Sequence, residues 1–171
     1  MRYNPAITAT LSCFAFAASA MALPNVTHIV HNDLHAAVLA ALAHTPGQVL
    51  EADQERGEEN YEIDIVHDHQ ITEVEVDAET GKVVEAKTDE IKHRIKAFFI
   101  SDKKIAALKA AKISMPDAIA KAEDSTHARA ISAEFEREDE QYVYEIKLEA
   151  DGKRIKARVN ANTGHMESRE H

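Results

Sequence analysis

Three histidines near the N-terminus of the chain have a spacing that suits metal binding. His28, His31 and His35 recur at intervals of three and four residues. On a helix with about 100° per residue, they would fall within an arc of about 60°, one imidazole above the next. Such a set can bind Zn²⁺, Cu²⁺ or Ni²⁺, and His67 and His69 at a predicted hairpin tip are further candidate ligands. The alternative is that all five are solvated histidines beside an apolar stripe.

Residue types that support covalent or acid–base catalysis do not fall into a recognisable pattern. The single cysteine, Cys13, lies in an apolar stretch at the N-terminus, and the sequence contains no Gly-x-Ser-x-Gly elbow. It also contains no His-Glu-x-x-His motif, phosphate-binding loop or dinucleotide fingerprint. The sequence therefore predicts a protein that is not an enzyme, with no catalytic residue and no organic cofactor.

Residues 1–22 have the features of a secretory signal peptide. Arg2 precedes an apolar stretch over residues 6–22, which has no acidic residue and ends in Ala-Met-Ala. This stretch is shorter than the roughly 20 residues of a membrane span, and small residues stand where signal peptidase requires them. We expect cleavage after Ala22, and therefore a periplasmic or secreted protein without a stable membrane span. An uncleaved membrane anchor is the alternative.

Removal of residues 1–22 leaves an acidic chain without cysteine. The 19 remaining Lys and Arg stand against 30 Asp and Glu, a formal charge of −11. Binding to phosphates needs clustered Lys and Arg, so this balance argues against a nucleic-acid partner. Because no disulfide can form within one chain, residues 23–171 must be stabilised by their own core, and their number suffices for one ordinary domain or two small ones.

An internal repeat organises the rest of the chain. The tripeptide Tyr-Glu-Ile at residues 61–63 recurs at 144–146, and Thr-Gly at residues 80–81 recurs at 163–164, both at an offset of 83 residues. Self-similarity at one fixed offset is typical of repeated structural units. The sequence therefore predicts two copies of one module.

Each copy begins with a helical pattern and continues with strand patterns. Apolar residues recur at helical spacing over residues 30–42 and 113–122, where Ser114 is the predicted N-cap of the second helix. Period-two alternation follows, and the repeated Thr-Gly predicts a tight hairpin turn in each copy. We expect an α+β fold in which each module is a helix packed on a small antiparallel β-sheet. The predicted boundaries are residues 23–88 for the first module, 89–112 for a helical connector and 113–171 for the second module.

Several stretches of both copies match a known type of small exported module. In the first copy they are Ala-Leu-Ala-His-Thr-Pro-Gly at residues 41–47, Tyr-Glu-Ile-Asp-Ile-Val at 61–66 and Glu-Val-Glu-Val-Asp-Ala-Glu-Thr-Gly-Lys-Val at 73–83. In the second copy they are Tyr-Glu-Ile-Lys-Leu at 144–148 and Ala-Arg-Val-Asn-Ala-Asn-Thr-Gly at 157–164. The chain thereby resembles a tandem PepSY domain protein.

The resemblance implies one helix on a short antiparallel sheet in each copy, no catalysis, and a role in restraining a peptidase or modulating an envelope sensor. We therefore expect a protein-interaction module whose partner is an envelope protein or a peptidase. The alternative function is that of a periplasmic metal-binding protein that uses the N-terminal histidine cluster. The histidine helix is the feature that discriminates between these two functions.

The two copies differ in the charge expected on their solvent-facing strand positions. The first copy has only acidic residues at five such positions: Glu62, Asp64, Glu73, Glu75 and Asp77. The second copy has mostly cationic residues at the matching positions: Glu145, Lys147, Lys156, Arg158 and Asn160. We expect that the two faces either dock on each other or recognise different partners, and the alternative is two solvated faces that have diverged.

Overall fold

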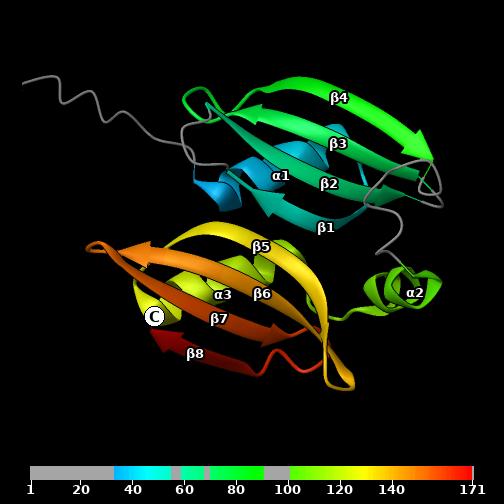
Figure 1. Ribbon diagram of the computed structural model, residues 1–171. Coiled ribbons are helices and arrows are strands. Elements are labelled where there is room, and N and C mark those ends of the chain that lie inside the picture. The colour runs from blue at the N-terminus through cyan, green and yellow to red at the C-terminus, as the bar shows by residue number, and fades with distance from the viewer. Residues whose placement is uncertain (1–32, 55–58, 68–69, 91–100, 171) are drawn as a thin grey trace, which may run out of the picture.

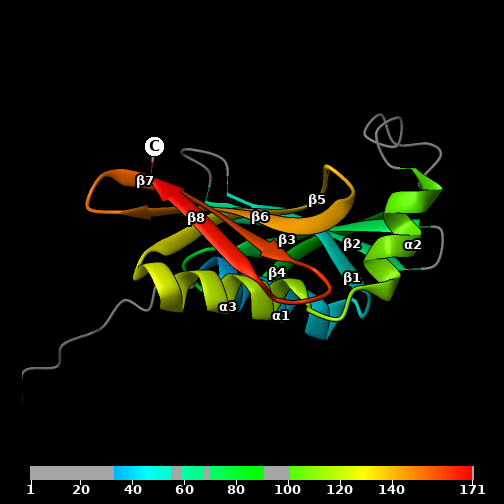
Figure 2. The same ribbon diagram turned by 90° about the horizontal axis from the view of Figure 1, so that it is seen from below.

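The computed structural model describes residues 33–54, 59–67, 70–90 and 101–170. Within these residues, the strands form one eight-stranded antiparallel sheet (Figure 1). Two of the helices lie on the same side of this sheet (Figure 2). No helix in the described part of the chain is long and apolar enough to cross a membrane.

The first copy is a helix followed by four antiparallel strands. Asp33 caps helix α1 (Leu34–His44), because its Oδ1 accepts a hydrogen bond of 2.8 Å from the backbone N–H of Ala36. The strands are β1 (Gln48–Asp53), β2 (Asn60–His67), β3 (Gln70–Asp77) and β4 (Val83–Glu90). Each strand pairs with the next one along the chain.

The second copy repeats this arrangement. Helix α3 (Met115–Thr126) begins at the predicted N-cap Ser114, whose Oγ accepts a hydrogen bond of 3.3 Å from the backbone N–H of Asp117. The strands are β5 (Arg129–Glu138), β6 (Gln141–Ala150), β7 (Lys153–Asn160) and β8 (Met166–Glu170). The last strand has five residues against eight in β4, because the sequence after the second Thr-Gly turn is polar and has little apolar surface to bury.

The hairpin turns predicted from the repeated Thr-Gly are confirmed. Gly81 and Gly164 have φ angles of 67° and 69°, which glycine adopts without steric cost. Before the first of them, Asp77 Oδ1 accepts a hydrogen bond of 2.6 Å from the backbone N–H of Thr80, and Asn160 has the corresponding role in the second copy. The hydrogen bonds from Thr80 hold the pKa of Asp77 below its ordinary value.

The two copies share one sheet, which corrects the expectation of two separate small sheets. The strand order is β4-β3-β2-β1-β5-β6-β7-β8, so the first strand of each copy lies at the centre. β1 and β5 are antiparallel, with Ala52 opposite Ala133. Sequence alternation predicts individual strands but not which edges meet, because the backbone groups that pair are the same at every edge.

The junction between the copies is symmetric. Ala52 lies opposite Ile63 in the first copy, and Ala133 lies opposite Ile146 in the second. Because Ile63 and Ile146 are equivalent at the offset of 83 residues, Ala52 and Ala133 are also equivalent. They face each other directly, so an approximate twofold axis passes between them and relates the two copies.

The core lies between the sheet and the helices. α1 and α3 contact each other and the strands of both copies, and they lie side by side on one face (Figure 2). The largest buried strand residues are Tyr61, Phe135 and Tyr144, each at most 1% exposed. Burial of such apolar surface stabilises the fold by roughly 25 cal/mol per Å². We call the opposite face of the sheet the open face.

A third helix, α2 (Asp102–Ala110), lies within the predicted connector. Its Ile105 and Leu108 are buried, so this helix packs on the rest of the protein. The predicted connector began at Asp89, whereas β4 extends one residue beyond that position. Residues 91–100 lie outside the described residues.

Candidate interaction surface

Carboxylates from three strands cover the open face of the first copy. Glu62 and Asp64 alternate along β2 with Tyr61 and Ile63, which are buried on the helix side. The strand register extends this alternation to both neighbours of β2, because residues that lie opposite each other point to the same face. The resulting set, which we call the acidic surface, consists of Glu51, Asp53, Glu62, Asp64, Glu73 and Glu75.

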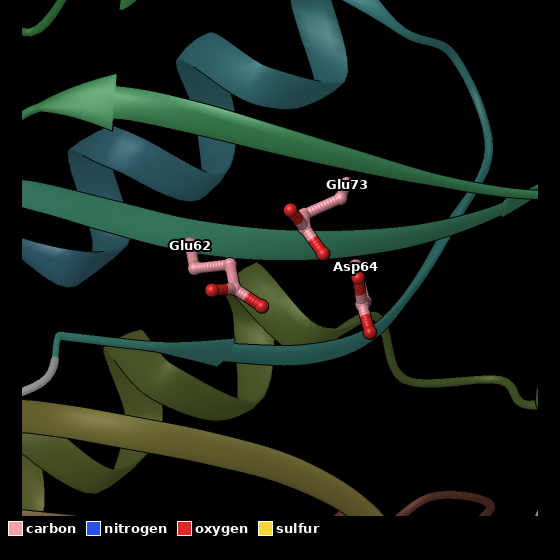
Figure 3. Close-up of side chains that lie close together, drawn as sticks. All are labelled: Glu62, Asp64 and Glu73. Atoms are coloured by element: carbon pink, nitrogen blue, oxygen red, sulfur yellow. The ribbon is translucent and has the colours of Figure 1, made fainter. Parts of the chain in front are cut away.

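Three members of the acidic surface lie especially close together. Carboxylate oxygens of Glu62, Asp64 and Glu73 are all within 4.8 Å of one another. Figure 3 shows these three side chains together on one side of the strands, with the helices behind them. Asp64 is only 2% exposed, which brings its carboxylate into a region of low dielectric. Carboxylates of this kind attract cationic groups, but an acidic cluster alone does not identify a ligand.

Cationic side chains prevail at the matching positions of the second copy. Lys156 on β7 lies opposite both Lys147 on β6 and Arg169 on β8. Arg158 occupies the position that is equivalent to Glu75 in the first copy. We call the following residues the basic surface: Lys147, Lys156, Arg158 and Arg169.

Part of the basic surface is compensated within the protein. Lys156 Nζ lies 2.7 Å from Glu145 Oε1, and Arg158 Nη1 lies 2.7 Å from Glu138 Oε1. Burial acts to raise the pKa of Glu145, but its hydrogen bonds and charge interactions with Lys156 and Arg158 outweigh burial and lower the pKa overall. The second copy therefore stabilises this partly buried carboxylate with its own cations.

At the centre of the sheet, carboxylates crowd one another. Burial raises the pKa of Glu136, and the negative charges of Glu134 and Glu145 raise it further. One cation from the connector helix opposes this effect, since Lys104 Nζ lies 3.5 Å from Glu134 Oε1. The acidic character of the first copy thus continues onto β5 of the second copy.

The two charged surfaces lie side by side. β1 pairs with β5, so the open faces of both copies form one continuous face. Of the two expected roles, docking of one charged face on the other within the chain is therefore wrong, and recognition of different partners stays a prediction. The physical reason is that the copies join through backbone hydrogen bonds at strand edges, which leaves both faces directed to the same side of the sheet.

The histidines of the predicted metal site lie only partly within the described residues. His28, His31 and His69 are outside them, while His35 lies in the first turn of α1 and His67 at the end of β2. β2 ends beside the start of β1, which follows the C-terminal end of α1. His67 is therefore about two to three helical turns from His35 along the axis of α1, so the structure does not bring these two residues together. The metal site stays a prediction.

The sheet of the described residues has two edges, β4 and β8. An edge strand can extend its sheet by pairing with another chain in an extended conformation. Both edges carry an acidic and a basic residue two positions apart on the open face. These are Glu85 and Lys87 on β4, and Glu167 and Arg169 on β8.

Sequence reasoning missed β1 and the edge strands as parts of the surface. Glu51 and Asp53 flank buried Ala52, so period-two alternation was the signal that could have identified them. On the edge, the register of β3 and β4 shifts between Glu75 and Val76. Because of this bulge, corresponding residues of β4 and β8 are not separated by 83 residues. A comparison of the sequence at an offset of 83 therefore does not show that the two edge strands correspond.

Comparison with known proteins gives one family and one solved structure. The family model described as "Peptidase propeptide and YPEB domain" (PepSY) matches residues 34–87 and 112–170, which correspond to the two copies. No curated protein matches the chain. A candidate lipoprotein from Clostridium difficile 630 is similar in structure, with a TM-score of 0.43 and 13% identity over 82% of this chain and 95% of that chain.

Proposed function

The chain belongs to the PepSY family, and from this premise we propose that it is a non-catalytic module of the cell envelope that binds and restrains a peptidase. The observation that carries the proposal is the double match to a domain described as a peptidase propeptide. A propeptide acts by binding its peptidase, so the relevant property is a contact surface. The envelope location rests on the signal peptide expected in residues 1–22.

Strand addition is the physical route that we propose for this contact. Peptide substrates and inhibitors bind in extended conformation, and the exposed edge of a sheet supplies backbone donors and acceptors in that conformation. In this recognition mode backbone hydrogen bonds supply affinity, while side chains beside the edge supply specificity. The acidic and basic surfaces lie beside β4 and β8 respectively, so each edge would select a partner of different charge.

Inhibition of hydrolysis tests the proposal. Residues 23–171, which include all described residues, are added to secreted metallopeptidases of the source organism, and cleavage of a peptide substrate is measured. We expect inhibition of at least one peptidase that saturates at one chain per enzyme. Two matched variants, Ala86→Pro on β4 and Ser168→Pro on β8, remove one edge donor each, and we expect one of them to weaken inhibition about tenfold or more.

A circular-dichroism spectrum equal to that of the unmodified protein is the control for each proline variant. Peptidases that all retain full activity would remove the main support for the proposal. Inhibition that both proline variants retain would keep the peptidase as partner but would move the contact from the edges to the open face.

A further inference from the structure

The junction between the two copies shows how strand edges of this module pair. β1 and β5 join in antiparallel orientation about an approximate twofold axis, and the equivalent residues Ala52 and Ala133 lie opposite each other at that axis. The protein thus contains one example of a twofold edge-to-edge contact between PepSY modules.

β4 offers a second edge of the same kind. It has eight residues and lies at the end of the described sheet. Ala86 lies at its centre, between Glu85 and Lys87, whose side chains share the open face with Glu75 and Glu73. Val84 on the same strand is 55% exposed, one of two large apolar side chains in the described residues that are so exposed.

The side chains of β4 are complementary to those of a second, antiparallel β4. Within one chain, Lys87 Nζ lies 2.7 Å from Glu85 Oε2. When Ala86 of one copy lies opposite Ala86 of another, Glu85 of each copy also lies opposite Lys87 of the other, so each charge gains a second opposite charge. Opposite charges at directly opposed positions stabilise antiparallel strands, so one register is favoured over its neighbours.

We propose that β4 pairs with β4 of a second copy of this chain, in antiparallel register centred on Ala86, to form a twofold dimer with one continuous sheet. The charge pattern of β4 supplies the complementarity that carries this assignment. The inference goes beyond the proposed function, since it concerns a second copy and not a peptidase. It leaves β8 as the free edge of each chain in the dimer.

β8 provides the matched control. Glu85 lies opposite Glu75, and Glu167 lies opposite Arg158, so Glu85 and Glu167 are equivalent in the two copies. Lys87 and Arg169 are equivalent in the same way. β8 is shorter, with five residues, so it offers fewer backbone hydrogen bonds to a partner strand.

Charge reversal tests the dimer. The molar mass of residues 23–171 is measured by sedimentation at several concentrations for the unmodified chain, for Glu85→Lys and for Lys87→Glu. Each variant places like charges opposite each other across the twofold axis. We expect the unmodified chain to dimerise and each variant to lose about tenfold or more in dimer affinity.

Mixing the two variants distinguishes loss of the contact between two copies of β4 from damage to the β4 strand itself. In a mixed pair, the two lysines of Glu85→Lys face the two glutamates of Lys87→Glu, so we expect dimer affinity to return to the level of the unmodified chain or above it. The controls Glu167→Lys and Arg169→Glu on β8 are expected to leave the dimer unchanged. A monomer at every concentration, or a dimer that only the β8 variants weaken, would overturn the proposal.

A cysteine at the axis tests the register. After removal of residues 1–22 the chain has no cysteine, so Ala86→Cys introduces the only thiol. Directly opposed Cβ atoms lie about 4.5–5.5 Å apart, close enough for a disulfide after a small adjustment. We expect mild oxidation to crosslink Ala86→Cys and to leave Ser168→Cys mostly monomeric. Equal crosslinking of both variants would contradict the assignment, and loss of peptidase inhibition has no bearing on either result.

Discussion

The two copies agree on the helix side of the sheet and differ on its open face. Buried Tyr61 and Ile63 are matched by buried Tyr144 and Ile146, and β1 and β5 bulge at equivalent positions. On the open face, Asp64, Glu73 and Glu75 of the first copy are replaced by Lys147, Lys156 and Arg158 in the second. Close packing restricts the size and polarity of residues on the helix side, whereas solvent on the open face tolerates either charge.

One difference between the copies does lie in a packed region. Gly47 precedes β1 in the first copy, and Ala128 holds the equivalent place before β5. A Cβ atom on Gly47 would lie 2.5 Å from Cγ2 of Ile65 and 2.7 Å from the backbone oxygen of Val66. The first copy is therefore packed too closely at this point to accept the alanine of the second.

Among the variants that test this difference between the copies, Gly47→Ala is expected to change the free energy of unfolding most. Ile65 is buried and the Val66 oxygen belongs to the backbone, so neither can move away without disturbing β2. We expect the free energy of unfolding to fall by about 3 kcal/mol, measured by urea denaturation. The reverse exchange in the second copy, Ala128→Gly, should cost only about 0.5–1 kcal/mol. Equal costs for the two exchanges would show that the copies are packed alike at this position.

A smaller effect is expected from hydrogen bonds within and between the copies. Tyr144 Oη donates a hydrogen bond of 2.7 Å to the backbone oxygen of Ile113, and burial raises the pKa of Tyr144 to about 12, so the phenol remains a donor at neutral pH. Arg129 Nη2 donates a hydrogen bond of 2.7 Å to Tyr61 Oη and thereby connects the second copy to the first.

We expect Tyr144→Phe to lower the free energy of unfolding by about 1 kcal/mol, because the Ile113 oxygen loses a partner in a partly buried site. Arg129→Ala should lower the free energy of unfolding by only a few tenths of a kcal/mol, because Arg129 is exposed and water can take its place. Both values come from chemical denaturation under the same conditions. A larger cost for Arg129→Ala would mean that the contact between the copies stabilises the protein more than the contact within the second copy.

The smallest effects are expected from two glutamates of the open face whose pKa values shift in opposite directions. The pKa of Glu145 is lowered, so its contribution to stability is present above the ordinary value of 4.5 and is lost as the pH falls through the folded-state pKa. The pKa of Glu136 is raised, so its favourable contribution is present below 4.5 and is lost as the pH rises through the folded-state pKa.

Thermal unfolding of Glu145→Gln and Glu136→Gln across the acidic pH range tests this opposition. At neutral pH, Glu145→Gln should lower the melting temperature. The corresponding loss in the free energy of unfolding should be less than about 1 kcal/mol. Glu136→Gln should raise it slightly, because the variant removes a charge that its neighbours repel. Both differences from the unmodified protein should shrink below pH 4.5. Melting temperatures that shift in the same direction for both variants at neutral pH would contradict the charge arrangement described for the open face.

Much of each module could be predicted from the sequence because its signals are local. Ser114 caps α3 as predicted, since an N-cap hydroxyl bonds to the free backbone N–H of a residue only three positions further along the chain. Gly81 and Gly164 take positive φ angles because the hairpin turn needs them. Glu62 and Glu73 lie on the open face because strand residues alternate. For the same reason, strand alternation alone predicts the charge difference between the copies.

The sequence by itself determined the repeat, the helix caps, the hairpin turns and the division of each strand into a buried and a charged side, because these depend on neighbours along the chain. Only the tertiary structure decided that β1 pairs with β5, that the acidic and basic surfaces share one face, and that His35 and His67 lie apart. Such pairings join residues about 80 positions apart through backbone groups that every residue has, so side-chain patterns do not specify which strand edges meet.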